Sequence, residues 1–139
     1  MRVRIWGCRG SIAAPGASTK RYGGNTSCVE IRPASGEVVI LDAGTGIREL
    51  GARLVEEGVR RIHLLLTHLH VDHLEGLGMF APIYEDGTEL HIWGPASPVA
   101  SLEDRIATYF SPPLFPLTLA EVHARVDYHD ASESEWAID

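Results

Sequence analysis

The segment 64–77, LLLTHLHVDHLEGL, constrains the fold and the chemistry of this chain more than any other. An apolar run ends at Thr67, and three histidines and an aspartate follow within six residues. A short apolar run that stops in this way is typical of a buried strand ending at a sheet edge, which is where α/β proteins place their sites. The pattern therefore predicts a functional loop directly after a buried strand.

The side chains in this loop are metal ligands by residue type, because neutral imidazole and carboxylate bind Zn²⁺ and the harder divalent ions. In an extended or turning segment, His68 and His70 project to the same side. Asp72 and His73 follow at the start of a predicted helix and reach a neighbouring position. One segment can therefore supply two ligands to each of two adjacent metal ions. In the competing interpretation these are ordinary surface residues, with Asp72 as the cap of a helix that begins at His73.

Hydrophobic periodicity along the rest of the chain predicts a sheet that is covered by helices. Strands are predicted where apolar residues alternate or run continuously, and helices where they recur at helical spacing. Several strands followed by strand–helix–strand–helix units favour an α/β or α+β architecture. The predicted strands cover 1–7, 26–32, 38–44, 62–67, 90–94 and 122–128, and the predicted helices cover 47–57, 97–110 and a stretch that begins at 74.

The balance of charge weighs against nucleic acid as the favoured partner. The 139-residue chain has a formal net charge of -7, whereas a surface that grips the phosphate backbone is basic. The net charge does not exclude a local basic patch near the N-terminus, because several cations fall early in the sequence. They are Arg2, Arg4, Arg9, Lys20 and Arg21.

No segment of the sequence is typical of a membrane span or of a secretory signal. The longest apolar runs are far too short to cross a bilayer, and residues 1–10 contain no long apolar core. The two cysteines, Cys8 and Cys28, are expected to be reduced thiols rather than a disulfide. These features predict a cytoplasmic protein with no membrane partner.

The loop sequence THLHVDHLEG resembles the H-x-H-x-D-H motif of the metallo-β-lactamase superfamily. Upstream, VILDAGTGIREL is similar to the strand–Asp–Gly–helix segment of that family. GCRGSIAAPG followed by YGGNTSCVEI is similar to the N-terminal hairpin region of its phosphodiesterase branch, which includes RNase Z-like proteins. The resemblance extends from Met1 to about Pro116. It implies an αββα sandwich, in which two sheets pack face to face with helices outside.

The resemblance also implies a role for each residue of the motif. His68 and His70 would bind the first metal ion, and Asp72 and His73 the second. Asp72 would also act in catalysis, by orienting the attacking water or by accepting its proton. The implied cofactors are two divalent metal ions, with Zn²⁺ first and Mn²⁺ or Fe²⁺ as alternatives, because His and Asp suit all three.

Two residues outside the ligand set are candidates to support the metal ligands by hydrogen bonding. Asp42, at the end of a predicted strand, would hold the motif loop in place, although a turn-forming role before GTG accounts for it equally well. Thr67 would bond to the same loop, or would simply be a β-branched residue at a strand end.

The second half of the family's ligand set has no counterpart in this sequence. Further histidines and a bridging aspartate are expected downstream, and only His91, His123 and His129 follow the motif. His91 falls within a predicted strand and the other two fall on a solvated face, while a His129–Asp130 ligand pair is disfavoured. We therefore expect an α+β fold that is about the N-terminal half of the αββα sandwich, with residues 1–139 as one partial domain.

A half sandwich exposes the inner face of its sheet, which is a large apolar patch. This face is expected to pair with the missing C-terminal half or with a second copy of the chain. Either partner would remove the patch from water.

The function that the resemblance implies first is a dinuclear metal-dependent hydrolase that acts on a phosphodiester, with a cyclic nucleotide or a related small phosphodiester as the first candidate substrate. An RNase Z-like nuclease that processes the tRNA 3′ end is one alternative, and the acidic composition weighs against it. A catalytically incomplete half-domain that acts as an interaction module is the other alternative.

Overall fold

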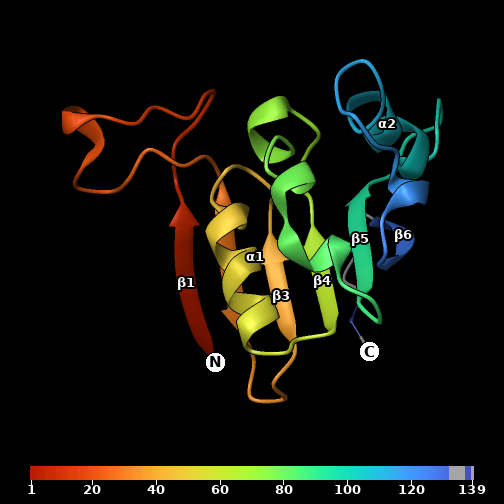
Figure 1. Ribbon diagram of the computed structural model, residues 1–139, viewed down its shortest axis with the longest axis horizontal. Coiled ribbons are helices and arrows are strands. Elements are labelled where there is room, and N and C mark those ends of the chain that lie inside the picture. The colour runs from red at the N-terminus through yellow and green to blue at the C-terminus, as the bar shows by residue number, and fades with distance from the viewer. Residues whose placement is uncertain (132–136, 139) are drawn as a thin grey trace.

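The computed structural model describes residues 1–131, 137 and 138, and its centre is one six-stranded sheet (Figure 1). The strands are β1 (Arg2–Gly7), β2 (Cys28–Arg32), β3 (Val38–Leu41), β4 (Arg61–Leu65), β5 (Glu89–Pro95) and β6 (Arg125–Ala131). They lie in chain order across the sheet. β1, β2 and β3 are antiparallel neighbours, and β3 to β6 run parallel. The carboxyl ends of β3 to β6 therefore lie at the same edge of the sheet.

Two α-helices connect strands of the parallel part. Helix α1 (Ile47–Glu56) links β3 to β4 and ends just before Gly58, whose φ of 69° is the left-handed conformation that glycine adopts at helix ends. Helix α2 (Leu102–Tyr109) follows β5, and the Ser101 hydroxyl caps it by accepting a hydrogen bond from the Asp104 N–H. The second helix thus begins several residues later than the apolar spacing predicted.

Both helices pack on one face of the sheet and bury its apolar side chains. Buried positions alternate along β3 and β5, as expected for a sheet with one covered face, whereas β4 also buries His63 on the other face. The strand residues of this core are Val38, Ile40, Ile62, Leu64, Leu90 and Ile92, and the helix residues are Ile47, Leu50, Leu54, Leu102 and Ile106.

The opposite face of the sheet is more open. Val3 and Ile5 of β1 are 53% and 65% exposed. Further apolar residues of this face are half-buried, and they are Val29, Ile31, Val39, Leu41 and Leu65. An apolar face of this kind is what one layer of a two-sheet sandwich presents. The architecture is therefore α+β, as predicted, with one open apolar face, and the partial domain stays a prediction.

The α-helix predicted to begin at Leu74 is wrong, because short 3-10 turns take its place. The turns are η2 (Val71–His73), η3 (Leu77–Met79) and η4 (Ala81–Tyr84). Close tertiary packing explains the difference, since a Cβ atom at Gly76 would collide with the carbonyl oxygen of Gly44. Pro82 follows soon after and has no N–H to continue a helix. The apolar side chains of this stretch still enter the core, but from turns rather than from a helix.

No helix in the described part of the chain is long and apolar enough to cross a bilayer. Cys8 is exposed, Cys28 is buried, and both are free, as predicted. Burial raises the pKa of the Cys28 thiol to about 12, so this thiol stays protonated at neutral pH.

Candidate metal centre

The histidine motif occupies the loop that leaves the carboxyl end of β4. Backbone pairing continues for one residue past the strand, where the Leu66 N–H donates to the Trp93 carbonyl at 2.8 Å. The loop then passes through His68 and His70 into η2 at the upper edge of the sheet in Figure 1. The buried strand thus delivers the motif to a sheet edge, as the sequence pattern predicted.

Asp42 holds this loop from the end of β3. Its φ of 63° is a left-handed conformation that Asp tolerates better than most residues. The side chain is only 5% exposed. Its oxygens accept hydrogen bonds from the Thr67 N–H and hydroxyl, both at 2.9 Å, and from the Ser27 hydroxyl at 3.0 Å. His73 Nδ1 lies 2.8 Å from Asp42 Oδ2. Asp42 therefore bonds to the motif loop, as the supporting role expects, and its left-handed backbone directs the chain away from the end of β3.

The Thr67 hydroxyl extends this support to a second histidine. A hydroxyl carries one hydrogen, and this one is donated to Asp42 at 2.9 Å. The oxygen then faces His68 Nδ1 at 3.1 Å and His73 Nδ1 at 3.4 Å. In neutral imidazoles, these contacts favour the proton on Nδ1 of both His68 and His73. Nε2 of each ring is left with a lone pair, which is the form that binds a metal ion.

The four predicted ligands form two neighbouring pairs of donor atoms. His68 Nε2 lies 3.1 Å from His70 Nδ1, and His73 Nε2 lies 3.6 Å from the Asp72 carboxylate. Two donors that share a tetrahedral Zn²⁺ are about 3.3 Å apart, given bond lengths of about 2.0–2.1 Å. The ring centroids of His68 and His73 are 4.1 Å apart, so the pairs adjoin. The donor types and separations therefore fit one divalent ion at each pair.

Neither pair is a complete metal site. Among residues 1–131, 137 and 138, no three His, Cys, Asp or Glu side chains form a group that could hold an ion. Zn²⁺ sites in proteins use three or four protein ligands. Tight binding at either pair therefore needs ligands beyond those described, and the binding of two metal ions stays a prediction.

Asp72 is held by the N-terminal segment rather than by a helix end. Its Oδ2 accepts a hydrogen bond from the Ser11 N–H at 2.7 Å, across 61 positions of sequence. No side chain caps η2, so the capping role considered for Asp72 does not hold. The Ser11 N–H lowers the pKa of the Asp72 carboxyl, which is therefore ionised at neutral pH.

The histidines downstream of the motif lie away from it. His123 is exposed at 59% of its side chain. His129 and Asp130 are consecutive residues of β6, so their side chains point to opposite faces of the sheet and cannot form a ligand pair. His91 packs on the open face between His63 and His129.

Residues that the sequence analysis did not single out also support the loop. Ser27 bonds to Asp42, and the Thr26 hydroxyl donates to Glu75 Oε1 at 2.9 Å while accepting from the Thr45 N–H at 2.8 Å. These contacts tie the start of β2 to the end of the motif. Ser11 acts through a backbone N–H that every residue except proline has, so no feature of its side chain could have signalled its role.

Comparisons with known proteins show which proteins this chain is similar to. A family model described as a beta-lactamase superfamily domain matches residues 37–134. A ribonuclease Z of Pyrococcus abyssi is 27% identical over 109 residues, which cover 75% of this chain and 35% of that protein. An uncharacterized protein of Mycobacterium leprae is 32% identical over 81 residues, which cover 58% of this chain and 25% of that protein. The matched regions thus span about a quarter to a third of the length of these two relatives.

The family match covers well over half of the chain and includes the parallel strands together with the histidine loop. A sheet with helices on one face is also half of the sandwich that this family builds. The chain therefore belongs to the metallo-β-lactamase superfamily.

Proposed function

We propose that this chain carries part of a dinuclear metal-dependent hydrolase site and that the bond cleaved is a phosphodiester. The observation that carries the proposal is the two adjoining donor pairs at the sheet edge, His68 with His70 and Asp72 with His73. Two divalent ions there would supply hydroxide near neutral pH and neutralise negative charge on a phosphoryl oxygen. Zn²⁺ is the first candidate, with Mn²⁺ and Fe²⁺ as alternatives.

The chain's own residues would hold these groups in place. Hydrogen bonds to Asp42 and Thr67 keep Nε2 of His68 and His73 available as ligands. The ionised Asp72 carboxylate would bind one ion and orient the attacking water, while the Ser11 N–H fixes its position. Supporting hydrogen bonds of this kind are as much a part of a metal site as the ligands are.

Similarity to a ribonuclease Z supports a phosphodiester over the other bonds that hydrolases cleave. A cyclic nucleotide or related small phosphodiester is the candidate that the net charge of -7 favours, when charge is summed over the whole chain. An RNase Z-like nuclease is the alternative within the same chemistry. A catalytically incomplete half-domain that serves as an interaction module is a second candidate function, favoured by the lack of a third ligand among the described residues.

We also infer that the open face of the sheet pairs with a second layer. Val3 and Ile5 are more than half exposed, and their neighbours on that face are apolar. The second layer would be the remainder of a longer protein or a second copy of this chain. A monodisperse monomer in sedimentation, with no binding of an apolar dye, would contradict this pairing.

Metal content and phosphodiester hydrolysis test the hydrolase. The complete protein, with the ligands that the described residues lack, is expected to retain Zn²⁺ or Mn²⁺ after refolding and to hydrolyse bis-(p-nitrophenyl) phosphate or a cyclic nucleotide. His70→Ala removes a donor 3.1 Å from His68 and should lose metal and most of the turnover. His123→Ala, on the exposed surface, is the matched control and should retain both. Absence of retained metal, with equal turnover by the two variants, would reject the hydrolase and leave the interaction module.

A further inference from the structure

Positive charge is concentrated in the N-terminal part of the chain. Residues 1–29 contain five of the 12 Lys and Arg side chains and none of the 19 Asp and Glu side chains, the first of which is Glu30. The net charge of -7 therefore combines a basic segment with a strongly acidic remainder. The field at a protein surface follows the local distribution of charge, so the sum does not exclude a polyanionic ligand at the basic segment.

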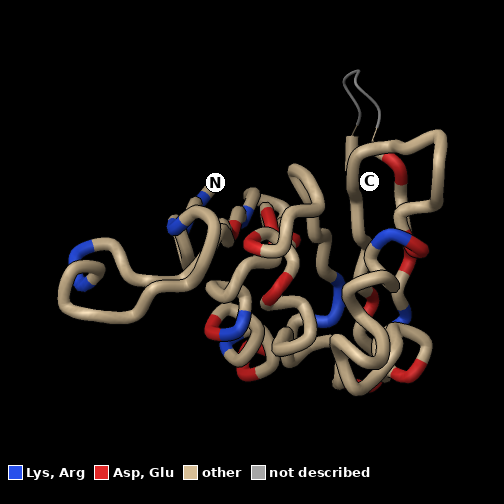
Figure 2. The backbone as a smooth tube through the Cα atoms, turned by 90° about the horizontal axis from the view of Figure 1, so that it is seen from above, with Lys and Arg blue, Asp and Glu red and all other residues tan. Residues whose placement is uncertain are grey.

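Three of these cations lie on a loop that we call the basic arm, residues 8–25. Figures 1 and 2 show the arm projecting from the sheet, and Lys and Arg are coloured at its outer end in Figure 2. Backbone hydrogen bonds cross the arm, from the Ala14 N–H to the Gly24 carbonyl at 2.9 Å and from the Gly23 N–H to the Thr19 carbonyl at 2.8 Å. The arm is thus a built hairpin that holds its cations away from the acidic part of the molecule. The cations are Arg9, Lys20 and Arg21.

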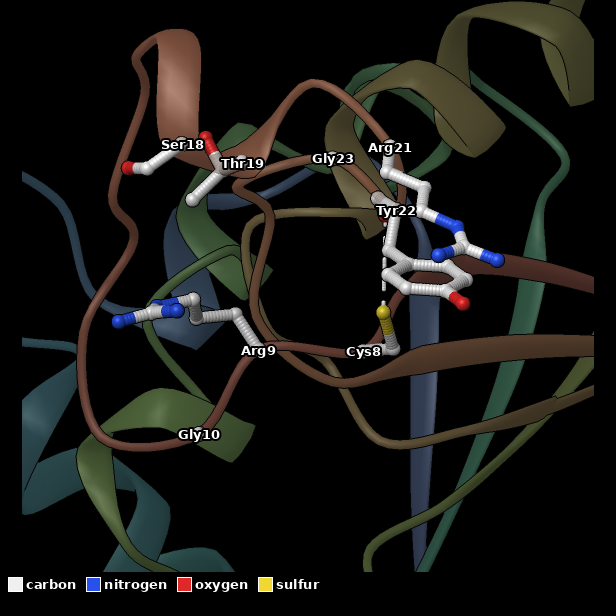
Figure 3. Close-up of a pocket in the computed structure, with 8 residues that line it drawn as sticks. All are labelled: Cys8, Arg9, Gly10, Ser18, Thr19, Arg21, Tyr22 and Gly23. Atoms are coloured by element: carbon white, nitrogen blue, oxygen red, sulfur yellow. Dashed lines mark hydrogen bonds between the residues drawn. The ribbon is translucent and has the colours of Figure 1, made fainter.

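The arm encloses a pocket of about 250 Å³ (Figure 3). Cys8 Sγ lies 3.5 Å from the Tyr22 carbonyl oxygen and joins the two sides of the pocket. Within the described part of the chain no acidic residue lines it, and the guanidinium and hydroxyl groups are donors suited to phosphate oxygens. The lining residues that carry such side chains are Arg9, Ser18, Thr19, Arg21 and Tyr22.

The arrangement of these side chains suits a strand rather than a single anion. The guanidinium groups of Arg9 and Arg21 extend in different directions from the pocket (Figure 3), so they would meet two phosphates better than one. Tyr22 is 71% exposed, and the Arg21 guanidinium carbon lies 5.0 Å from the centroid of its ring. An exposed aromatic ring among cations is how proteins bind single-stranded nucleic acid, because the ring stacks on a base while the cations follow the backbone.

The arm is also joined to the candidate metal loop. Ser11, two positions from Arg9, has a φ of 71° and donates its N–H to Asp72 at 2.7 Å. A ligand that lies along the arm would therefore approach the loop that carries the predicted metal ligands. The acidic remainder of the chain would repel the same ligand from other surfaces.

We propose that the basic arm binds a single-stranded nucleic acid and presents it to the metal loop. The proposal rests on the proposed phosphodiester hydrolase and names its substrate class, a nucleotide strand in place of a cyclic mononucleotide. Arg9 and Arg21 take two phosphates of the strand, and Tyr22 stacks on a base. A cyclic mononucleotide has one phosphate and could use only part of this surface.

Binding of a fluorescein-labelled single-stranded RNA of about a dozen nucleotides tests the proposal. Anisotropy is measured with the full chain in EDTA, which prevents metal-dependent cleavage. The double variant Arg9→Gln/Arg21→Gln should bind on the order of tenfold more weakly, and the slope of log affinity against log salt should decrease by about 1.4, because two phosphate contacts are lost. Arg60→Gln/Arg125→Gln removes the same charge at the opposite edge of the sheet and should bind like the wild type. Equal binding by the two double variants would overturn the proposal.

The aromatic contribution has its own pair of variants. Tyr22→Ala should weaken RNA binding roughly tenfold, whereas Tyr22→Phe keeps the ring and should bind normally. Equal effects of these two substitutions would overturn the stacking role, as would a duplex that binds as well as the single strand.

Hydrolysis of bis-(p-nitrophenyl) phosphate by the metal-loaded wild type is measured separately. RNA binding that depends on the arm, without this hydrolysis, would reject the proposed hydrolase but would support the role of the basic arm in RNA binding. Hydrolysis together with RNA binding that does not depend on the arm would reject the RNA-binding role of the basic arm but would support the proposed hydrolase.

Discussion

Two groups of three histidines in this molecule differ in what surrounds them. The motif histidines are His68, His70 and His73, and the sheet histidines are His63, His91 and His129 on β4, β5 and β6. Both groups are compact, with ring centroids 4.1 Å and 4.5 Å apart in the first and 4.9 Å and 5.4 Å apart in the second. Proximity alone therefore does not distinguish them.

Two of the motif histidines are oriented by oxygen atoms behind their rings. His73 Nδ1 faces Asp42 at 2.8 Å, and His68 Nδ1 faces the Thr67 hydroxyl at 3.1 Å. A proton on each Nδ1 leaves Nε2 as a donor of electrons to a metal ion.

The sheet histidines instead contact one another and Trp93. His91 Nδ1 lies 3.2 Å from His129 Nε2, and the Trp93 indole N–H donates to His63 Nδ1 at 3.3 Å. Asp127 is 3.7 Å from His91, beyond hydrogen-bond distance. Burial lowers the pKa of His63 and of His91, so the neutral rings are favoured. The comparison teaches that oxygen atoms next to the ring nitrogens, rather than the number of histidines, distinguish the candidate metal loop from the sheet histidines.

Asp42→Asn should have the largest effect on the difference between the motif histidines and the sheet histidines, because it changes the oxygen atoms that face the motif loop. The amide would place an NH₂ group where the carboxylate accepts hydrogen bonds from Ser27 and His73. Metal affinity should fall about 10–100-fold, and the free energy of unfolding by about 1–3 kcal/mol. Competition with a chelator and urea unfolding measure the two effects. Asp130→Asn, on the surface, is the matched control, and an equal effect there would remove the special role of Asp42.

Thr67→Val should have a smaller effect on the same group. Valine keeps the shape of threonine but removes the hydroxyl that faces His68 Nδ1, so metal affinity should fall about tenfold. Thr67→Ser keeps the hydroxyl and should bind metal nearly as well as the wild type. If valine and serine bound metal equally, the hydroxyl would have no part in orienting His68.

The sheet histidines should make the free energy of unfolding depend on pH. Because burial lowers the pKa of His63 and His91, the folded state binds fewer protons than the unfolded state in mildly acidic solution. The free energy of unfolding should therefore decrease as the pH falls below about 6.5, by at most about 1.4 kcal/mol per pH unit for each histidine. His63→Phe should reduce this slope in urea unfolding measured from about pH 7 to 5. An unchanged slope would mean that His63 is not among the groups that titrate on unfolding.

The strands could be predicted from the sequence with only small errors at their ends. Alternation along a strand reports which side chains face the core, and all six predicted strands are confirmed. The helix expected from Leu74 is wrong for a reason that only contacts reveal. A Cβ atom at Gly76 would collide with Gly44, and one at Gly78 would collide with the Phe115 ring.

The candidate site could be predicted in part. Residue type, spacing and the family resemblance pointed to four candidate ligands together with Asp42 and Thr67, and the structure brings all six to one edge of the sheet. Their metal-binding roles stay predictions. The contact of Ser11 with Asp72 could not be predicted, because it joins a backbone N–H to a side chain 61 positions away.

The sequence by itself determined which donor atoms the loop offers and that a buried strand delivers them to a sheet edge. It also determined that cations gather near the N-terminus. Only the tertiary structure decided which ring nitrogen of His68 and of His73 is free, because Asp42 and Thr67, 25 positions apart, are hydrogen-bonded to each other and face Nδ1 of these two rings. It likewise decided that the basic arm meets the metal loop, since that contact depends on where the chain places residues distant in sequence.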